Sequence, residues 1–269
     1  MKRVVINLPL LLALVFAGCQ KDVSTNTNDP LVISAVSASD KANTFYGPQV
    51  QIGNGKARSW IRISKSGEPE ELGVELTPGA LQGLPDSQPG YAYVLPLHQK
   101  AQAVTPYDHI SFDWNPHGHE PAHVFDVPHF DIHFYMISLA DQMAIPAPSP
   151  STMPMFMNIN PSNLPADYTI PGGPVPQMGM HWLDRTSNLF QGVPFSQVLI
   201  YGTFNGRVIF VEPMITRALL LSSPDITAPL KQPSVYNPTG TNYPTEYNIY
   251  TDSKTGNIMI SLGSFTAVP

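Results

Sequence analysis

The sequence predicts a mainly β protein, an antiparallel sandwich or barrel-like single domain with long proline-rich loops and few short helices. Three observations predict this class: apolar and polar residues alternate with a period of two in several short runs, turn-forming residues separate these runs, and runs with a helical period are scarce. Because 42% of the residues are hydrophobic and only 13% are charged, a disordered chain is excluded, and the 29 prolines belong to ordered turns and loops.

The first expected strands are residues 45–52 and 58–63, which the turn Gly53-Asn54-Gly55 joins as a hairpin. The second run alternates in the manner of a half-buried strand. Further strands are expected at residues 73–76, 91–97, 109–114, 127–137, 198–203, 208–211, 247–250 and 258–262.

Helix is expected only in short pieces. Thr77-Pro78 provides an N-cap and a proline at the first helical position, opening one turn that ends near Leu84. Ser138 caps a short helix through residue 143, while residues 215–221 fit either a helix or a strand. Residues 145–179 combine many prolines with no periodicity, which predicts a long ordered excursion over the surface.

The N-terminus indicates a bacterial lipoprotein signal at residues 1–18. Lys2 and Arg3 precede a short apolar stretch, and small residues come directly before Cys19. Cleavage before Cys19 and lipidation there would anchor the protein to a membrane, on the outer membrane or the cell surface outside the cytoplasm. The alternative is an ordinary secretory signal with an incidental cysteine. Residues 19–43 predict a flexible tether, and residues 44–269 form the expected mainly β domain.

The net charge and the number of cysteines restrict which partners the protein can bind and which catalytic chemistry it can use. Without Lys2 and Arg3 the balance is 12 − 20 = −8, which argues against nucleic acid as a partner. The expected partners are the membrane, through the lipid anchor, and a small molecule. Because Cys19 is the only cysteine, an internal disulfide is excluded, and because Cys19 is expected to carry the lipid, cysteine catalysis is excluded as well.

The strongest candidate site lies on the expected strand at residues 127–137. Residues two apart on a strand face the same side, so this strand has one apolar face and one polar face. The polar face consists of His129, Asp131, His133 and Tyr135. Burying such a face is unfavourable unless its members bind something, and we expect the two imidazoles to bind one divalent metal ion. The alternative is a solvated face with locally satisfied histidines.

Two distant residues complete the expected metal site. His181 ends the proline-rich excursion, and Glu212 ends a hydrophobic run. With His129 and His133 they give three histidines and one carboxylate, a set that suits zinc first and iron, manganese or copper after it. Three protein ligands and a water are the pattern of a catalytic ion, whereas four fixed ligands indicate a structural ion.

Two carboxylates and three further side chains have expected roles around this ion. Asp131 is a third ligand or orients a histidine, and Asp131 or Glu120 would move protons in a catalytic site. We expect the remaining side chains to lie beside the metal ligands or to face a substrate; they are His117, His119 and Tyr135. A flexible solvated loop is the alternative for residues 117–123.

Several segments resemble one family, at residues 50–60, 72–74, 81–85, 128–135, 179–182 and 212–216. The order of these segments and their amino-acid sequences resemble those of an uncharacterised family of secreted bacterial proteins. This family is defined by a domain of unknown function and includes a Thermus member under sigma/anti-sigma control. The resemblance spans roughly residues 44–265, and its most specific part is the His-Phe-Asp-x-His-Phe-Tyr strand. The resemblance implies a mainly β domain in which the His, Asp and Glu residues of these segments are functional. It does not imply a particular reaction.

The sequence therefore leaves three hypotheses. The first is an envelope lipoprotein with a zinc-like divalent-metal site, acting as a metal-dependent hydrolase or lyase on a small substrate. The second is a non-catalytic lipoprotein that binds metal or a ligand, in stress response or metal handling. The third is a structural surface module in which the histidines are packed and satisfied.

Overall fold

The computed structural model describes residues 43–87 and 90–269. The expected signal peptide, the expected lipidation site Cys19 and nearly all of the expected tether lie outside the described residues. None of the described helices is both long and apolar enough to cross a membrane.

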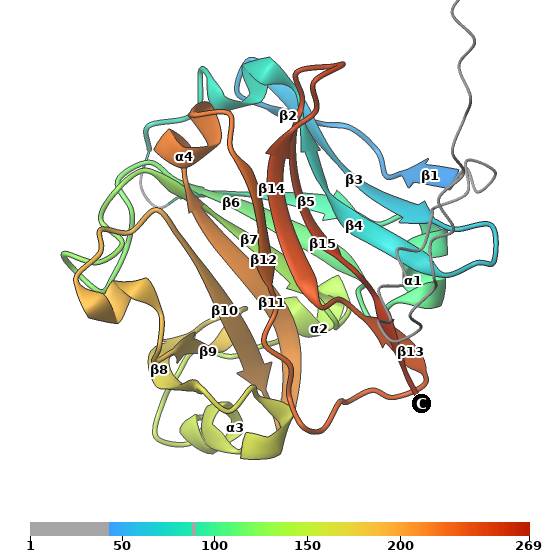
Figure 1. The fold of residues 1–269 in the computed structure, drawn as a ribbon. Coiled ribbons are helices and arrows are strands. Elements are labelled where there is room, and N and C mark those ends of the chain that lie inside the picture. The colour runs from blue at the N-terminus through green and yellow to red at the C-terminus, as the bar shows by residue number, and fades with distance from the viewer. Residues whose placement is uncertain (1–42, 88–89) are drawn as a thin grey trace, which may run out of the picture. The chain divides into compact units, whose positions relative to one another are not determined.

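Two antiparallel sheets, each of seven strands, form the framework of the described chain (Figure 1). The first sheet contains, in spatial order, β1 (Asn43–Tyr46), β3 (Gly55–Ile63), β4 (Pro69–Leu76), β15 (Ile258–Gly263), β14 (Glu246–Thr251) and β12 (Asp225–Pro229), with β2 (Val50–Ile52) also paired to β3. The second sheet contains, in spatial order, β5 (Tyr91–Pro96), β6 (His109–Asn115), β7 (His129–Tyr135), β11 (Arg207–Thr216), β10 (Gln197–Phe204), β9 (Gly179–Asp184) and β8 (Tyr168–Val175). A separate pair consists of β13 (Thr241–Tyr243) and β16 (Thr266–Val268).

The two large sheets share one hydrophobic core. Ile61 and Leu72 of the first sheet lie in the same buried cluster as Phe112, Phe130 and Phe134 of the second. Because the apolar faces of both sheets are covered in this way, the layout is an unclosed sandwich of antiparallel sheets. The predicted mainly β class is confirmed, in its sandwich form.

The helices are short, as the sequence predicts. They are α1 (Gln99–Val104), α2 (Leu139–Met143), α3 (Met153–Met157) and α4 (Arg217–Leu221), with 3₁₀ turns at Pro78–Leu81, Pro161–Asn163 and Asn188–Gln191. Ser138 caps α2 by accepting a hydrogen bond from the backbone N–H of Asp141. Thr216 caps α4 in the same way, so residues 215–221 are the end of a strand followed by a helix.

Two expectations about regular structure need correction. Residues 45–52 are two strands, β1 and β2, because residues 47–49 lie outside both strands and Pro48 has no backbone N–H to donate to a ladder. Residues 145–179 are not free of regular structure, since they contain α3, the whole of β8 and the first residue of β9. The prolines of β8 are tolerated because this strand lies at the edge of its sheet and its pairing with β9 has irregular register.

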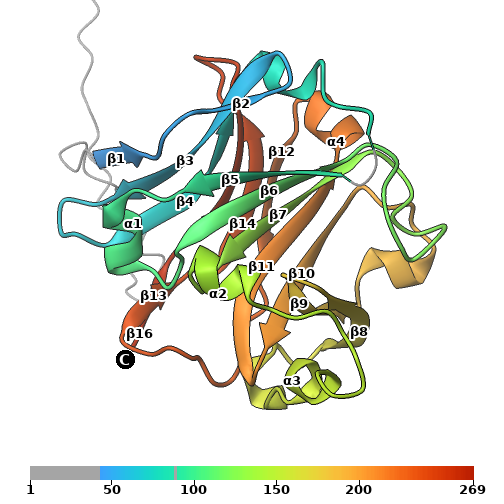
Figure 2. The same cartoon turned by 180° about the vertical axis from the view of Figure 1, so that it is seen from behind.

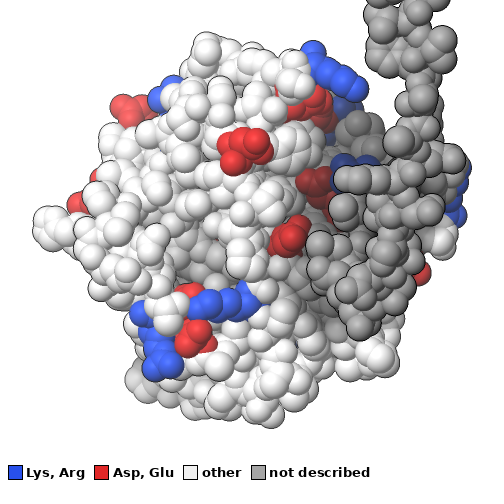
Figure 3. All heavy atoms as spheres, in the orientation of Figure 1, with Lys and Arg blue, Asp and Glu red and all other residues white. Residues whose placement is uncertain are grey.

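The face of the second sheet that points away from the shared core is also covered. In Figure 2, α2 and the chain that follows it lie in front of this sheet. Phe125, Ile145 and Phe156 from the connecting segments belong to one buried cluster with Ile200 and Phe210 of the sheet. Charged side chains are sparse on the visible described surface (Figure 3), in keeping with the low charged fraction of the sequence. The covered outer face of the second sheet holds the candidate site.

Candidate metal centre

Strand β7 buries both of its faces. Phe130, Ile132 and Phe134 have no exposed surface and pack in the shared core, as the alternation predicts. On the opposite face His129 and His133 are also fully buried. Since a buried polar side chain is unfavourable without a partner, the contacts of this polar face decide what it can do.

One set of side chains, which we call the inner group, consists of His133, His181 and Glu212. Sheet register brings them together, because β11 pairs with β7 and β10 connects β11 to β9. The Nε2 atom of His133 lies 3.5 Å from Oε1 of Glu212, and Nε2 of His181 lies 3.8 Å from Oε2. One ligand atom from each residue lies within 4.8 Å of the others, so small side-chain shifts would place all three around one ion.

The far sides of the two imidazoles face hydrogen-bond acceptors. Nδ1 of His133 lies 3.3 Å from Oδ2 of Asp113, and the other oxygen of Asp113 accepts a hydrogen bond from Ser111. Nδ1 of His181 is 3.3 Å from the carbonyl of Gly173. An acceptor behind Nδ1 keeps the proton there and turns the Nε2 lone pair toward the carboxylate, which is the usual arrangement of histidines that bind metal.

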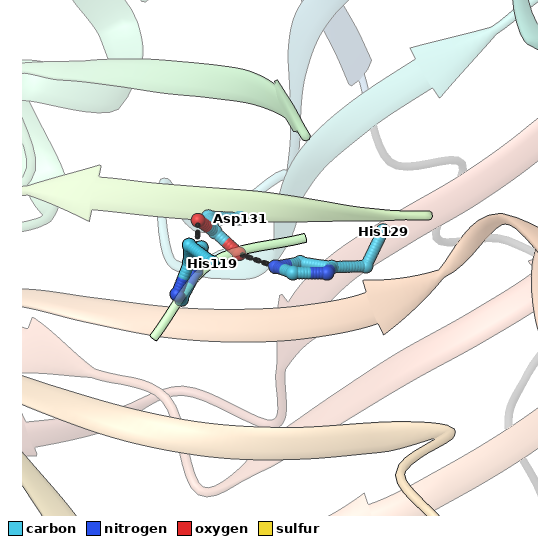
Figure 4. Close-up of side chains that lie close together, drawn as sticks. All are labelled: His119, His129 and Asp131. Carbon is cyan, nitrogen blue, oxygen red and sulfur yellow. Dashed lines mark hydrogen bonds and ion pairs between the residues drawn. The ribbon is translucent and has the colours of Figure 1, made fainter. Parts of the chain in front are cut away.

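A second set, which we call the loop group, consists of His119, His129 and Asp131 (Figure 4). Nε2 of His129 lies 3.1 Å from Oδ1 of Asp131, and Nε2 of His119 lies 3.1 Å from Oδ2. The carboxylate is held from the side by Asn115, whose Nδ2 donates to Oδ2 at 2.8 Å. Both imidazoles again have Nδ1 against a backbone carbonyl, that of Glu120 for His119 and that of Val127 for His129.

Polar atoms without hydrogen-bond partners concentrate on this face of the sheet. The described residues contain ten such buried side-chain atoms, and six of them belong to the two groups and to Asp113. These six are Oδ2 of Asp113, Nε2 of His129, Oδ1 of Asp131, Nδ1 and Nε2 of His133, and Oε2 of Glu212. Nδ1 of His133 and Oδ2 of Asp113 face each other at 3.3 Å, whereas the other four atoms belong to the two groups and face their other members. Unpartnered buried donors and acceptors are rare in folded proteins, so the gathering of these four points to a bound species that would satisfy them.

Burial and neighbouring charges shift the pKa values of the inner group. Burial lowers the pKa of His133, but the charges of Glu212 and Asp113 outweigh this effect and raise the pKa to about 9. Burial raises the pKa of Glu212 to about 8, against the opposing charge of His133. Burial and the charge of His133 together lower the pKa of His181 to about 4. At neutral pH the metal-free inner group therefore holds protons that a cation must displace.

The loop group is shifted in the same sense. Burial lowers the pKa of His119, but the hydrogen bond and charge of Asp131 outweigh it and bring the pKa to about 9. Burial raises the pKa of Asp131, yet its contacts with His119 and His129 hold that pKa well below the usual range. The carboxylate is therefore ionised and His119 protonated in the metal-free protein at neutral pH.

The four expected ligands are not gathered at one point. Three of them form the inner group, while His129 lies in the loop group. The reason is strand geometry: His129 and His133 are four residues apart on β7, about 13 Å along an extended chain, which is too far for one ion. Asp131 lies between them and contacts His129, not His133.

The other expected residues differ in how close they lie to these groups. Glu120 uses its Oε2 to accept the backbone N–H of Ala122, and it is exposed. His117 is an exposed partner of Asp86 at 3.1 Å. Tyr135 is fully buried and its ring stacks on that of His133, with centroids 5.5 Å apart.

Some side chains of the site were not among the expected residues. Ser111, Asp113 and Asn115 stand opposite the polar positions of β7 on the neighbouring strand β6. Their signal was present in the sequence, because polar residues alternate with apolar ones throughout residues 109–115. What the sequence did not show is that β6 pairs with β7 in this register.

The fold and the site define an antiparallel β-sandwich protein with two histidine–carboxylate groups on the covered outer face of one sheet. A family model described as TTHB210-like, "Hypothetical protein TTHB210", matches residues 64–114. This match supports a relationship to an uncharacterised domain family over a segment that ends in β6 and includes Ser111 and Asp113. No match was found among curated proteins or solved structures.

Proposed function

We propose that this chain is a divalent-metal-binding protein of the cell envelope, and that the inner group holds the ion. The observation that carries the proposal is a set of three potential ligands in which Nε2 of His133 and Oε2 of Glu212 have no hydrogen-bond partner. Nε2 of His181 lies 3.8 Å from that oxygen of Glu212. Two imidazoles and a carboxylate suit zinc, and iron(II) is the next choice for this donor set.

Burial favours holding the ion over rapid exchange. His133 is fully buried and Glu212 is 2% exposed, whereas the side chain of His181 keeps 13% of its surface exposed. The aromatic ring of Phe210 packs against both imidazoles, with centroids 4.8 Å from His133 and 5.2 Å from His181. An ion in these surroundings would leave slowly, which fits storage or structural use of the metal.

The donor set itself supports a second candidate, a metal-dependent hydrolase or lyase acting on a small substrate. Three protein ligands leave a coordination position for water, and a divalent ion supplies a lowered water pKa and a Lewis acid. Zinc-dependent hydrolysis of 4-nitrophenyl acetate that is lost in His133→Ala would favour this candidate. Zinc binding without any such activity would favour the binding protein.

Location in the envelope rests on the sequence. We propose that Cys19 is lipidated after removal of residues 1–18, and that the secretion and sigma/anti-sigma control implied by the family resemblance apply to this chain. Mass spectrometry of the membrane fraction tests the anchor. A diacylglycerol adduct on Cys19 is expected in the wild type, and Cys19→Ser should release the protein from the membrane or leave its signal uncleaved.

The test of metal binding compares the wild type with two variants. We expect His133→Ala to lose one bound zinc ion per chain after equilibration with zinc and removal of excess metal. His123→Asn is the matched control, because His123 is an exposed histidine outside both groups and asparagine tolerates its φ of 66°. Equal zinc content in the wild type and in His133→Ala would overturn the proposal.

A further inference from the structure

The loop between β6 and β7, residues 116–128, carries one residue of the loop group onto the sheet. Phe125 anchors this loop: its side chain is 3% exposed and lies in the buried cluster on the outer face. The N–H of His119 donates to the carbonyl of Phe125 at 3.3 Å, which fixes the imidazole beside β7. The position of His119 therefore depends on the docking of the whole loop.

The hydrogen bonds of the loop group define which imidazole nitrogens face the carboxylate of Asp131. A backbone carbonyl only accepts, so Nδ1 of His119 and Nδ1 of His129 each carry a proton, with N···O distances of 2.7 Å. In the neutral tautomer both Nε2 lone pairs then point at the oxygens of Asp131. Lone pairs that face a carboxylate at 3.1 Å repel it unless a cation or a proton lies between them.

We propose that the loop group is a second divalent-cation site, separate from the inner group and complete only when residues 116–128 lie on the sheet. The 3.1 Å separations match those between neighbouring ligands at about 2.0–2.2 Å from one ion, which are about 3–3.5 Å. Nε2 of His129 and Oδ1 of Asp131, both on well-buried residues, have no hydrogen-bond partner. Asn115 orients the carboxylate, as a hydrogen-bonded residue behind a metal ligand does.

The surroundings of the loop group distinguish it from the inner group. Aromatic rings of Phe125 and Phe195 pack beside His129, with centroids 6.4 Å and 5.3 Å away, and exclude water on that side. The side chain of His119, however, is 39% exposed. An ion would therefore enter and leave past His119, and we expect exchange at the loop group to be faster than at the inner group. Binding there would also tie the loop to the sheet.

The experiment uses the mature chain, stripped of metal and then loaded with zinc. Zinc content is measured by competition with a chromogenic chelator, and the hydrogen exchange of residues 116–128 is followed by mass spectrometry. The wild type should bind about two zinc ions per chain, and His119→Ala and His133→Ala about one each. Zinc should slow exchange in the loop roughly tenfold in the wild type and in His133→Ala, and should leave it unchanged in His119→Ala.

The two proposals fail in different ways. If His119→Ala keeps the zinc content of the wild type and its loop responds to zinc as in the wild type, the second site is overturned. If a single ion is lost in His119→Ala and kept in His133→Ala, the second site stands and the inner group is not a metal site. His123→Asn, in the same loop, should match the wild type in both measurements, and an equal loss there would also overturn the second site.

Discussion

Replacing Glu212 by glutamine should separate metal binding from folding. Glu212 is 2% exposed and its Oε2 has no hydrogen-bond partner, so in the metal-free protein it is an unsatisfied buried acid. Glutamine keeps the shape, cannot ionise, and can donate to the Nε2 lone pair of His181. Giving an unsatisfied buried group a partner recovers about 1–3 kcal/mol, so we expect metal-free Glu212→Gln to be at least as stable as the wild type.

The same change should remove the stabilisation by zinc at this site. A ligand present at 100 times its Kd adds about 2.7 kcal/mol to the free energy of unfolding. For a domain of about 225 residues, 1 kcal/mol corresponds to about 2–4 °C in Tm, so one zinc ion should raise Tm by about 5–11 °C. Calorimetry of both proteins with and without zinc measures this gain, and the part due to the inner group should be absent in Glu212→Gln.

Glu71→Gln is the matched control. Glu71 is also buried, but it pairs with Arg62 at 2.8 Å and accepts a hydrogen bond from Ser261, on the other sheet. Its replacement should lower Tm and preserve the full response to zinc, because no ligand is lost. The reasoning is refuted if Glu212→Gln behaves like Glu71→Gln, with a lower metal-free Tm and an unchanged zinc response.

Three further predictions concern pH, packing and the loop. Zinc affinity should fall as pH decreases below about 9, by roughly tenfold per pH unit for each displaced proton, because the pKa of His133 is raised to about 9 and its protonated form competes with the ion. Chelator competition between pH 6 and 9 measures this affinity, and a flat profile would contradict the prediction. Gly202→Ala should lower the free energy of unfolding by about 1–3 kcal/mol and weaken zinc binding, because a Cβ at this position would lie 2.0 Å from the ring of Phe210, which packs on His133. Chemical denaturation and zinc titration test this prediction, and unchanged values would show that the ring moves freely. Phe125→Ala should weaken zinc binding at the loop group about tenfold or more although all three ligands remain, because the loop loses its anchor. Zinc titration in a His133→Ala background isolates this site, and equal affinity would show that Phe125 does not position His119.

Much of the fold follows from local pattern. Residues 129–135 have to form a strand because Phe130, Ile132 and Phe134 recur with a period of two, and the structure puts all three in the shared core. Asn205-Gly206, a sequence typical of tight hairpin turns, joins β10 to β11, with Phe204 paired to Arg207. Each of these features is decided by residues close in sequence, which is why the sequence alone predicts them.

Proline-rich segments were harder to predict, because a proline has different meanings at an edge and in the middle of a sheet. Pro171 and Pro174 lie within β8, which is paired on one side only, so the missing N–H groups break no ladder on the open side. Local pattern does not reveal which strand will lie at an edge. Local pattern therefore predicts only a surface excursion at residues 145–179, whereas this segment contains the strand β8.

For the candidate site, the sequence by itself determined the chemistry of β7: histidine and carboxylate on one face of a strand whose other face is core, in a chain whose sole cysteine is expected to carry a lipid. Only the tertiary structure decided how these residues are grouped. His181 and Glu212 reach His133 through the pairing of β9, β10 and β11, and His119 reaches His129 through the docking of a loop. The physical reason is that an extended strand separates alternate side chains by about 7 Å, so one strand cannot surround an ion, and each group is completed by residues whose positions are set by sheet register and loop packing.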